Sequence, residues 1–298
     1  MTNDSKSVAK KIVVGVDGSD ASLAALRWAA HEAGRRDADV LVVSCYSAPV
    51  YGSPEGAVYT TNEDMGLLKK SACAVIGRAI DLVAEIDPTI VVDGLAEMSP
   101  AAMVISNAAH AGDEIVVGAT GHGTFMLGML GSVSMSVVHR SHVPVIVVPT
   151  KASIEPGHTM RKIVVGLDGS PDSLRALEWA YDEALSTGAE VAAVHAWIYP
   201  YSGQLEPRAL MKLDAMEELQ RGVKSLGSRL TDGSVQVHPR LSEKSAAGAL
   251  LDEAHDADLI VVGSHGRGAL RAALLGSVSR TVVQHATCPV AVIRRPAA

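Results

Sequence analysis

Short apolar runs rich in Val and Ile alternate along the chain with longer stretches whose apolar residues follow a helical spacing. In the first half these runs read KIVVGVD, ADVLVVSC, TIVVDGL, DEIVVGA and VPVIVVP, and their length and flanking turn signals are typical of buried strands. Leu23, Leu26 and Ala30 fall near helical spacing, which predicts an amphipathic helix after the first strand. In the second half the matching helix is expected to have Ser170 as N-cap and Pro171 as its first residue. Apolar strands that alternate with helices predict a parallel sheet covered on both faces.

The same order of elements is present twice. GVDGSDASLAALRWAAHEA in the first half aligns with GLDGSPDSLRALEWAYDEA in the second, with twelve of nineteen positions identical. The later strands also recur, as AEVAAVHA, SVQVHPRL, ADLIVVGS and CPVAVIRR. The segment Lys151–Thr159 is small and polar, contains Pro and Gly, and is interpreted as a linker. We therefore predict two tandem α/β domains, residues 9–150 and 160–298.

The composition restricts the class of protein. The 298 residues are 48% hydrophobic with a single Phe, so the core is expected to consist of Ala, Val, Leu and Ile. The formal net charge of −7 argues against binding nucleic acid by bulk attraction to phosphate. Cys45, Cys73 and Cys288 form no CxxC pair and are odd in number, which favours a reducing compartment. With no visible secretory signal and no apolar run long enough to span a bilayer, we expect a soluble cytoplasmic protein without a membrane partner.

Each half carries a glycine template, G-x-x-G-x9-G-S, that begins where its fourth strand ends. The first copy is GATGHGTFMLGMLGS, residues 118–132, and the second is GSHGRGALRAALLGS, residues 263–277. In open parallel sheets, ligands lie beyond the carboxyl ends of the strands. The closing Gly-Ser falls at the start of a helix, where unpaired N–H groups and a partial positive charge favour an anion. The template thus predicts a phosphate-binding site, and the alternative is a tight strand–helix connection in which the glycines serve only the turn.

A second recurrent feature is an aspartate that closes the first strand of each half. These residues are Asp17 and Asp168, each within a DGS sequence. A carboxylate at this end of a strand can accept hydrogen bonds from ribose hydroxyls. The alternative is an Asx-turn or a helix cap, and the two roles are compatible.

These features together resemble the universal stress protein family. The template with its closing Ser, the strand-closing Asp and the terminal CPV-type strand all match, over essentially the whole chain and in two copies. The resemblance implies two tandem Rossmann-like domains, each a five-stranded parallel sheet with helices on both faces. It also implies that ATP is bound, with Mg²⁺ held through the phosphates. By position, the nucleotide-binding residues would be Asp17, Cys45, Gly118, Gly121, Gly131, Ser132 and Ser134 in the first half and Asp168, Ala196, Gly263, Gly266, Gly276, Ser277 and Ser279 in the second.

The resemblance also assigns roles to these residues. Asp17 and Asp168 would hold the ribose, and the residue that closes the second strand, Cys45 or Ala196, would contact adenine through its backbone. The glycines and serines would line the ribose and phosphates. Because family domains pair through their last strands, the two halves are expected to form an internal pseudo-dimer, and whole chains are expected to pair again as a homodimer.

The two copies of the loop differ in charge. The first loop contains His122 and neither Arg nor Lys, whereas the second contains Arg267 and Arg271. The first site is therefore expected to hold a triphosphate more weakly, unless a metal ion supplies the missing charge. His122 and His265 are further candidates for contact with the phosphates.

No catalytic site is assigned from the sequence. Walker A, GxSxG and HExxH sequences are absent, and His139 and His142 have no visible third metal ligand. DGSPDS resembles the SGGxDS loop of ATP pyrophosphatases only distantly, because Asp168 replaces the leading Ser and Ser170 the second Gly. Slow hydrolysis or autophosphorylation stays open, although no residue is an evident general base.

The leading hypothesis is an ATP-binding regulator of a stress or dormancy response, whose conformation or assembly depends on nucleotide. The alternative is a scaffold that binds no nucleotide, or cyclic AMP, and acts through protein–protein contacts. The sequence identifies no protein partner.

Overall fold

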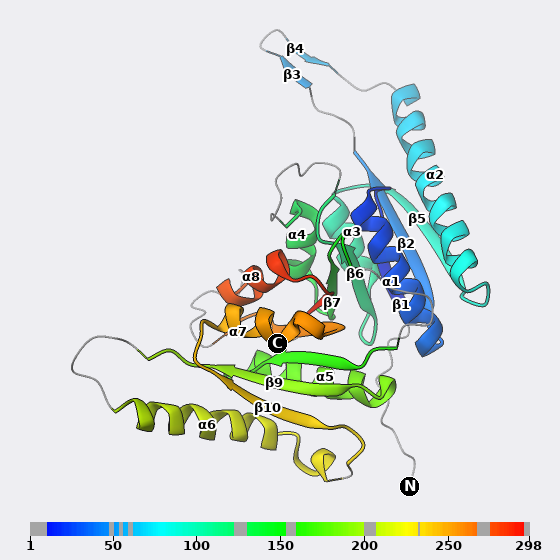
Figure 1. The fold of residues 1–298 in the computed structure, drawn as a ribbon. Coiled ribbons are helices and arrows are strands. Elements are labelled where there is room, and N and C mark those ends of the chain that lie inside the picture. Colours follow the sequence, from blue (N-terminus) through cyan, green and yellow to red (C-terminus); the bar gives the residue numbers. More distant parts are fainter. Residues whose placement is uncertain are drawn as a thin grey trace. The chain divides into compact units, whose positions relative to one another are not determined.

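The structure is a computed structural model in which the chain forms two compact units (Figure 1). Unit 1 is Met1–Val143 and unit 2 is Pro144–Ala298. The residues that the structure describes are 11–47, 51–53, 56–58, 62–121, 130–152, 159–199, 207–231, 233–266 and 275–294.

Unit 1 contains a parallel sheet with the strand order β6-β1-β2-β5. The strands are β1 (Lys11–Gly15), β2 (Asp39–Tyr46), β5 (Val92–Met98) and β6 (Glu114–Gly118). The helices are α1 (Asp20–Arg36), α2 (Asn62–Ile86), α3 (Ala101–Ala108) and α4 (Ser132–Arg140). Helix α1 packs against α2, and α2 lies along β2 and β5, whereas α3 packs against α4. An antiparallel hairpin of β3 (Tyr51–Ser53) and β4 (Gly56–Val58), which the sequence pattern did not predict, precedes α2.

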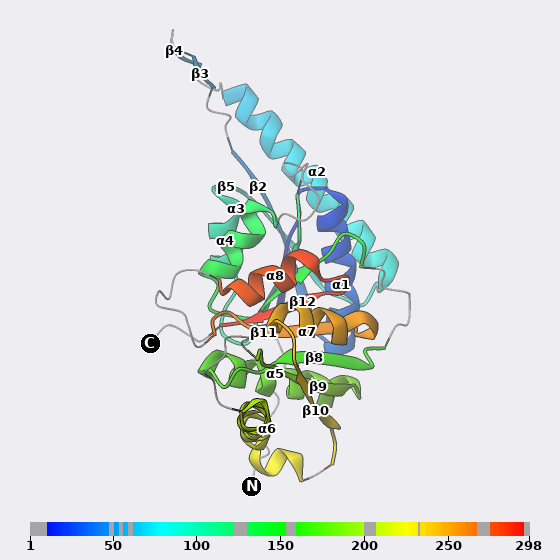
Figure 2. The ribbon, with the colours of Figure 1, turned by 60° about the vertical axis from the view of Figure 1, so that its left-hand side comes forward.

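Unit 2 repeats this arrangement with the strand order β10-β9-β8-β11-β12 (Figures 1 and 2). These strands, all parallel, are β8 (Lys162–Gly166), β9 (Glu190–Ala196), β10 (Val237–Ser242), β11 (Leu259–Gly263) and β12 (Val290–Ile293). The helical elements are α5 (Pro171–Thr187), α6 (Arg208–Lys224), η1 (Gly227–Leu230), α7 (Ala246–Glu253), η2 (Ala254–Asp256) and α8 (Ser277–His285). Helix α6 lies along β9 and β10, and α7 packs against α8. The predicted α/β class with parallel sheets is confirmed.

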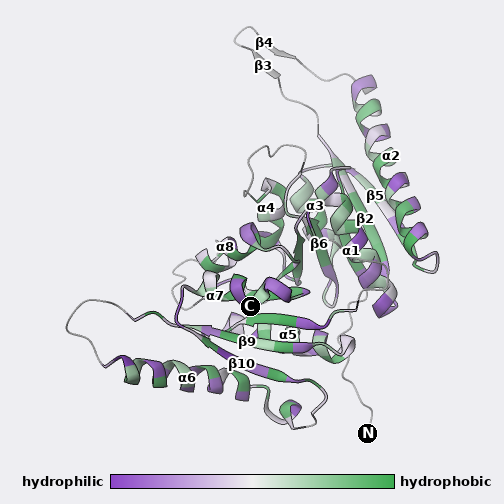
Figure 3. Cartoon of the chain, viewed as in Figure 1, coloured by the Kyte–Doolittle hydropathy of each residue, from purple (hydrophilic) through white to green (hydrophobic). Residues whose placement is uncertain are grey.

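The apolar runs form the centre of each sheet, as their composition requires. The central strands β1, β6, β8 and β11 are buried over most of their length. Figure 3 shows the neighbouring strand β2 as predominantly hydrophobic. The predicted start of α5 is also confirmed, because Ser170 Oγ accepts a hydrogen bond from the Ser173 N–H and Pro171 is the first helical residue. Among the described residues, no helix combines the length and apolar character needed to cross a bilayer.

The last strand of the first repeat, β7 (Val145–Val148), belongs to unit 2. It pairs with β12 in antiparallel register, with Val147 opposite Val290 and Val145 opposite Val292. The last strands of the two sequence repeats therefore pair with each other, as the resemblance implies. The compact units divide the chain before β7, whereas the sequence repeats divide it after β7, so the domain limits 9–150 and 160–298 stay a prediction.

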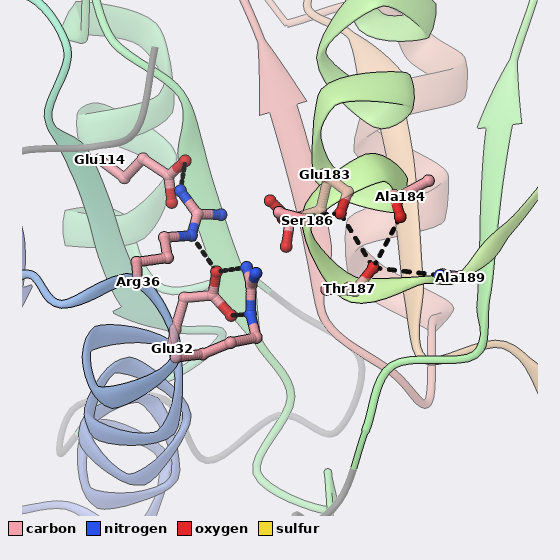
Figure 4. Close-up of polar contacts among 9 residues, drawn as sticks. Glu32, Arg36, Glu114, Glu183, Ala184, Ser186, Thr187 and Ala189 are labelled. Atoms are coloured by element: carbon pink, nitrogen blue, oxygen red, sulfur yellow. Dashed lines mark hydrogen bonds and ion pairs between the residues drawn. The ribbon is translucent and has the colours of Figure 1, made fainter. Parts of the chain in front are cut away.

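Unit 1 buries a cluster of charged side chains that unit 2 lacks (Figure 4). Arg36, at the end of α1, donates from Nη1 to Glu114 Oε1 at 2.6 Å and also pairs with Glu32. All three side chains are buried, and Glu114 Oε2 has no hydrogen-bond partner among the residues that the structure describes. Burial raises the pKa of Glu114 above its ordinary value of 4.5, against the opposing effect of the Arg36 charge.

Unit 2 has uncharged residues at three of the equivalent positions. Ser186 and Thr187 replace the two arginines at the end of the helix, and Leu259 replaces Glu114. The hydroxyls of Ser186 and Thr187 donate to the Glu183 carbonyl at 2.8 and 2.9 Å, as Figure 4 shows. The same fold position thus tolerates a buried charge cluster in one unit and an apolar residue in the other.

We expect Glu114→Leu, which copies Leu259, to stabilise the protein increasingly as the pH rises above 4.5. A folded-state pKa above the unfolded value means that the contribution of Glu114 is fully present below pH 4.5 and is lost as the pH rises through the folded value. Urea denaturation of both proteins between pH 5 and 8 measures this. A stability difference that does not change with pH would contradict the raised pKa.

Candidate functional site

The aspartate and the glycine template that both repeats share lie at the carboxyl ends of parallel strands. In unit 1, Asp17 follows β1 and the glycine loop follows β6, and these two strands are adjacent. In unit 2, Asp168 follows β8 and the second loop follows β11, which is again the adjacent strand. We call these places the first and the second strand-end site. They lie where open parallel sheets bind ligands.

The strand-closing aspartates organise the turn into the following helix. Asp17 Oδ1 accepts hydrogen bonds from the Ser19 N–H at 2.9 Å and from Ser19 Oγ at 2.6 Å. Asp168 Oδ1 accepts the same bonds from Ser170, at 3.0 and 2.5 Å. The alternative Asx-turn role is therefore real. These hydrogen bonds of the turn are all accepted by Oδ1.

The second carboxylate oxygen lies against the second glycine of the template. A Cβ atom placed on Gly121 would lie 2.8 Å from Asp17 Oδ2, and one placed on Gly266 would lie 2.5 Å from Asp168 Oδ2. Each glycine thus allows the loop to approach the carboxylate closely. Gly121 and Gly266 therefore lie directly beside the strand-closing aspartate of their unit.

The first glycine of each template has a purely structural explanation. A Cβ on Gly118 would lie 2.6 Å from the backbone carbon of Ala21 in α1, and one on Gly263 would lie 2.8 Å from that of Asp172 in α5. Repetition of these two glycines therefore follows from helix–strand packing. It gives no evidence of its own for a ligand.

Gly118→Ala is accordingly expected to lower the free energy of unfolding by about 1–3 kcal/mol, because helix α1 must move away from the end of β6. Gly77→Ala is the matched control. Gly77 lies in α2 with no atom within 4 Å of the added methyl group, so this change should stabilise the protein by up to about 1 kcal/mol. Urea denaturation compares the two, and equal stabilities would contradict the packing explanation.

Helices α4 and α8 begin without a side-chain cap. Their N-cap residues are Gly131 and Gly276, neither of which can offer a capping side chain. A Cβ on Gly131 would come within 3.4–3.6 Å of backbone atoms of residues 119–121, so the helix start lies directly beside the loop. Ser132 and Ser277, the first helical residues, are exposed. No N-cap side chain among the described residues accepts a hydrogen bond from the first-turn N–H groups of α4 or α8. Such N–H groups suit an anion.

Ser134 and Ser279 are oriented differently from the other predicted serines. Their side chains are buried, and each Oγ donates to the carbonyl of the first template glycine, Gly118 or Gly263, at 2.6 Å. These hydroxyls tie the helix to the strand end. What the two residues can still offer a phosphate is the backbone N–H.

Cys45 and Ala196 lie where the second strand of each sheet extends past its neighbour. The β1–β2 ladder ends at Gly15 opposite Val43, two residues before Cys45. The β8–β9 ladder ends with Val194, two residues before Ala196. The backbone at both positions lies beyond the ladder with the neighbouring strand, which suits contact with a planar base. Burial, and secondarily the charge of Glu97, raises the pKa of the Cys45 thiol to about 11, so Cys45 is a thiol at neutral pH.

The second strand-end site contains a polar cluster of which only His265 could be predicted from the sequence. Asp172 of α5 accepts a hydrogen bond from Ser264 Oγ, which is also 2.8 Å from His265 Nδ1. His265 is a candidate from its place in the template, but Asp172 and Ser264 lie 92 positions apart and only the fold brings them together. His122, Arg267 and Arg271 lie outside the described residues. Within the described ranges, no three His, Cys, Asp or Glu side chains gather as metal ligands.

The fold and the two strand-end sites define a tandem protein of the Rossmann-like α/β class. The family model that matches the chain is that of the universal stress protein family, over residues 9–149 and again over residues 159–294. The chain belongs to the universal stress protein family.

Curated relatives match the chain over nearly their whole length. A universal stress protein of Mycolicibacterium smegmatis is 36% identical over 292 residues, which covers 95% of this chain and 96% of the relative. Universal stress protein Rv2005c of Mycobacterium tuberculosis is 35% identical over 300 residues, with 95% and 97% covered. A crystal structure of a universal stress protein from Archaeoglobus fulgidus covers 96% of this chain and 99% of its own with a TM-score of 0.72. At 20% sequence identity, that structure supports the fold alone.

Proposed function

We propose that each unit binds ATP at its strand-end site and that the bound nucleotide regulates the conformation or assembly of the protein in a stress or dormancy response. Hydrolysis, if any, is slow, because the described residues of the sites include no general base placed for attack on a phosphate. The protein acts in the cytoplasm, as a homodimer of chains that are themselves internal pseudo-dimers.

One observation carries the proposal: an uncapped helix N-terminus, a glycine loop and an aspartate adjoin one another in both units. Gly131 abuts the loop of residues 119–121, and Gly121 in turn abuts the carboxylate of Asp17. A nucleotide presents a ribose next to a phosphate chain. The carboxylate accepts from ribose hydroxyls, and the first-turn N–H groups of α4 donate to phosphate oxygens.

The remaining features fit the same ligand. The backbone of Cys45 or Ala196 lies beyond the ladder with β1 or β8, where we expect it to meet the edge of adenine, and each residue still pairs with the other neighbouring strand, opposite Glu97 or Ser242. The exposed hydroxyls of Ser132 and Ser277 add donors at the phosphate end. Mg²⁺ bound to the phosphates would neutralise part of their charge.

The double variant Gly121→Ala, Gly266→Ala is expected to weaken ATP binding at least about tenfold. Each added methyl group would lie within 2.8 Å of an aspartate Oδ2, and the flexible carboxylate moves more easily than the backbone. Losing a hydrogen bond to a charged group costs about 1.5–3 kcal/mol. Isothermal titration with ATP and Mg²⁺ measures the affinity, and Gly77→Ala is the matched control. Unchanged ATP affinity would remove Asp17 and Asp168 from the site.

The same titration with cyclic AMP separates the proposal from its alternative. Binding of cyclic AMP in place of ATP, or of neither nucleotide, would favour a scaffold that acts through protein contacts. Light scattering with and without ATP determines whether chains pair and whether nucleotide changes the assembly.

A further inference from the structure

A buried histidine of unit 2 links the two strands that lead to the aspartate side of the second strand-end site. His195 is the penultimate residue of β9 and is 7% exposed. Its Nδ1 atom lies 2.7 Å from the carbonyl oxygen of Leu167, the residue that directly follows β8. Because a carbonyl oxygen can only accept, Nδ1 carries a proton and donates it to Leu167. The neutral imidazole forms this bond as well as the charged one does.

The backbone that His195 holds leads directly into the strand-closing aspartate. The carbonyl of Leu167 belongs to the peptide group that joins Leu167 to Asp168. The Leu167 N–H donates in turn to the Val194 carbonyl at 2.8 Å, so both polar groups of Leu167 are bonded to β9. Ala196, which we expect to meet adenine, directly follows His195. One side chain therefore holds the proposed ribose carboxylate at a set place relative to the proposed adenine contact.

Helix α6 packs over the same link. A Cβ atom placed on Gly222 would lie 3.2 Å from Leu167 Cδ1, and Glu218 Oε2, one turn earlier in α6, lies 3.9 Å from His195 Nε2. Leu167 and His195 are both buried, so the hydrogen bond between them is shielded from water. Groups that are fixed before a ligand arrives lower the cost of ordering the site on binding.

Unit 1 keeps the backbone part of this arrangement but not the imidazole. The Val16 N–H donates to the Val43 carbonyl at 2.9 Å, in the segment that leads into Asp17. Ser44 stands in the place of His195. The imidazole link is therefore a feature of unit 2, although both units have the strand-closing aspartate.

We propose that His195 is a positioning residue of the second strand-end site, which holds Asp168 in place for the ribose hydroxyls of the nucleotide. This inference rests on the proposed function. The imidazole does not itself contact the nucleotide and acts through the peptide group between Leu167 and Asp168. Unit 2 consequently distinguishes a ribose from a sugar without hydroxyl groups more strictly than unit 1 does.

The test compares the affinities of the full chain for ATP and for 2′,3′-dideoxy-ATP, each with Mg²⁺, by isothermal titration. Asp17→Ala is introduced throughout, so that discrimination between the two sugars comes from the second site. This parent protein should prefer ATP. His195→Ser, which copies Ser44, is expected to reduce the preference about three- to tenfold, the range for the loss of one hydrogen bond. A merely structural role of His195 would weaken both nucleotides alike and leave the ratio of their affinities unchanged.

Two further variants keep the test decisive if His195→Ser does not fold. His195→Asn offers an N–H at about the place of Nδ1 and should retain the preference for ATP. His195→Gln offers its N–H farther along the side chain, at about the place of Nε2, and should lose the preference. His238→Ser, on the edge strand β10, is the control and should leave the ratio of affinities unchanged.

The outcomes separate this inference from the proposed function. An equal preference for ATP in the parent protein, His195→Ser and His195→Gln would overturn the inference and leave ATP binding intact. ATP binding without any preference over the dideoxy compound would also overturn it, because Asp168 would then not hold the ribose. If the wild-type chain binds no ATP at all, the proposed function fails, and this inference fails with it.

Discussion

Arg36→Met is expected to lower the free energy of unfolding by about 3–5 kcal/mol, the range measured when one partner of a buried ion pair is removed. The Arg36 side chain pairs with both Glu32 and Glu114, and the carboxylates of both are almost completely buried. Methionine keeps much of the volume of the arginine but leaves the buried Glu114 carboxylate without the counter-charge of Arg36, whereas Glu32 keeps its ion pair with Arg35. Urea denaturation at pH 7, followed by tryptophan fluorescence, measures the loss.

Glu114→Leu separates this explanation from a general sensitivity of the region. It removes a buried carboxylate whose Oε2 has no hydrogen-bond partner within the described part of the chain, and Arg36 keeps its ion pair with Glu32. Leu259 shows that the fold accepts leucine at this position. The double variant Arg36→Met, Glu114→Leu should therefore recover much of the stability lost in Arg36→Met. Equal stability of Arg36→Met and the wild-type chain would contradict the proposed role of the cluster.

A carboxylate at the start of α4 and α8 is expected to lower ATP affinity by about ten- to a hundredfold. Ser132→Asp and Ser277→Asp place a negative charge where the phosphate chain is proposed to lie, and like charges 4 Å apart repel by about 1 kcal/mol in water and about 4 kcal/mol near a protein surface. The same charge should stabilise the helix by about 0.3–1 kcal/mol, because it interacts favourably with the helix dipole.

The opposite signs of these two effects make the experiment decisive. Ser132→Asn and Ser277→Asn are the uncharged controls and should retain most of the affinity. The loss in the aspartate variants should shrink as the salt concentration rises, because both residues are exposed and their charges are screened. If the aspartate variants bind ATP as tightly as the asparagine controls, the phosphates do not lie at these helix starts.

The fold could be predicted from local patterns because the central strands β1, β6, β8 and β11 are buried runs rich in Val and Ile, and α5 begins with a recognisable cap. The DGS turn could also be predicted, because Asp17 and Ser19 interact within three consecutive residues. Ser134 was harder: the sequence shows a serine in the first turn of a helix, but only the fold shows that it points toward Gly118. Local pattern also could not show that β7 belongs to unit 2, because its partner β12 is distant in sequence.

The buried polar groups are the features of the structure that the sequence predicted least. Glu114 begins an otherwise apolar strand, and its charge at that place was a signal that the sequence analysis did not use. The link from Asp172 to Ser264 and His265 joins segments that only tertiary structure brings together. The glycine template predicts that the backbone comes close to another group. At Gly118 that group is helix α1 and not a ligand.

The most direct test of ATP binding is to count the nucleotide that each chain holds. The protein is purified without added nucleotide, and one portion is denatured so that released nucleotide can be identified by chromatography and mass spectrometry. A second portion, stripped of nucleotide, is titrated with ATP and Mg²⁺. We predict ATP or ADP in the first portion and two ATP sites per chain in the second. No released nucleotide and no binding on titration would contradict the account, and the repeated glycines would then serve only the packing of the fold.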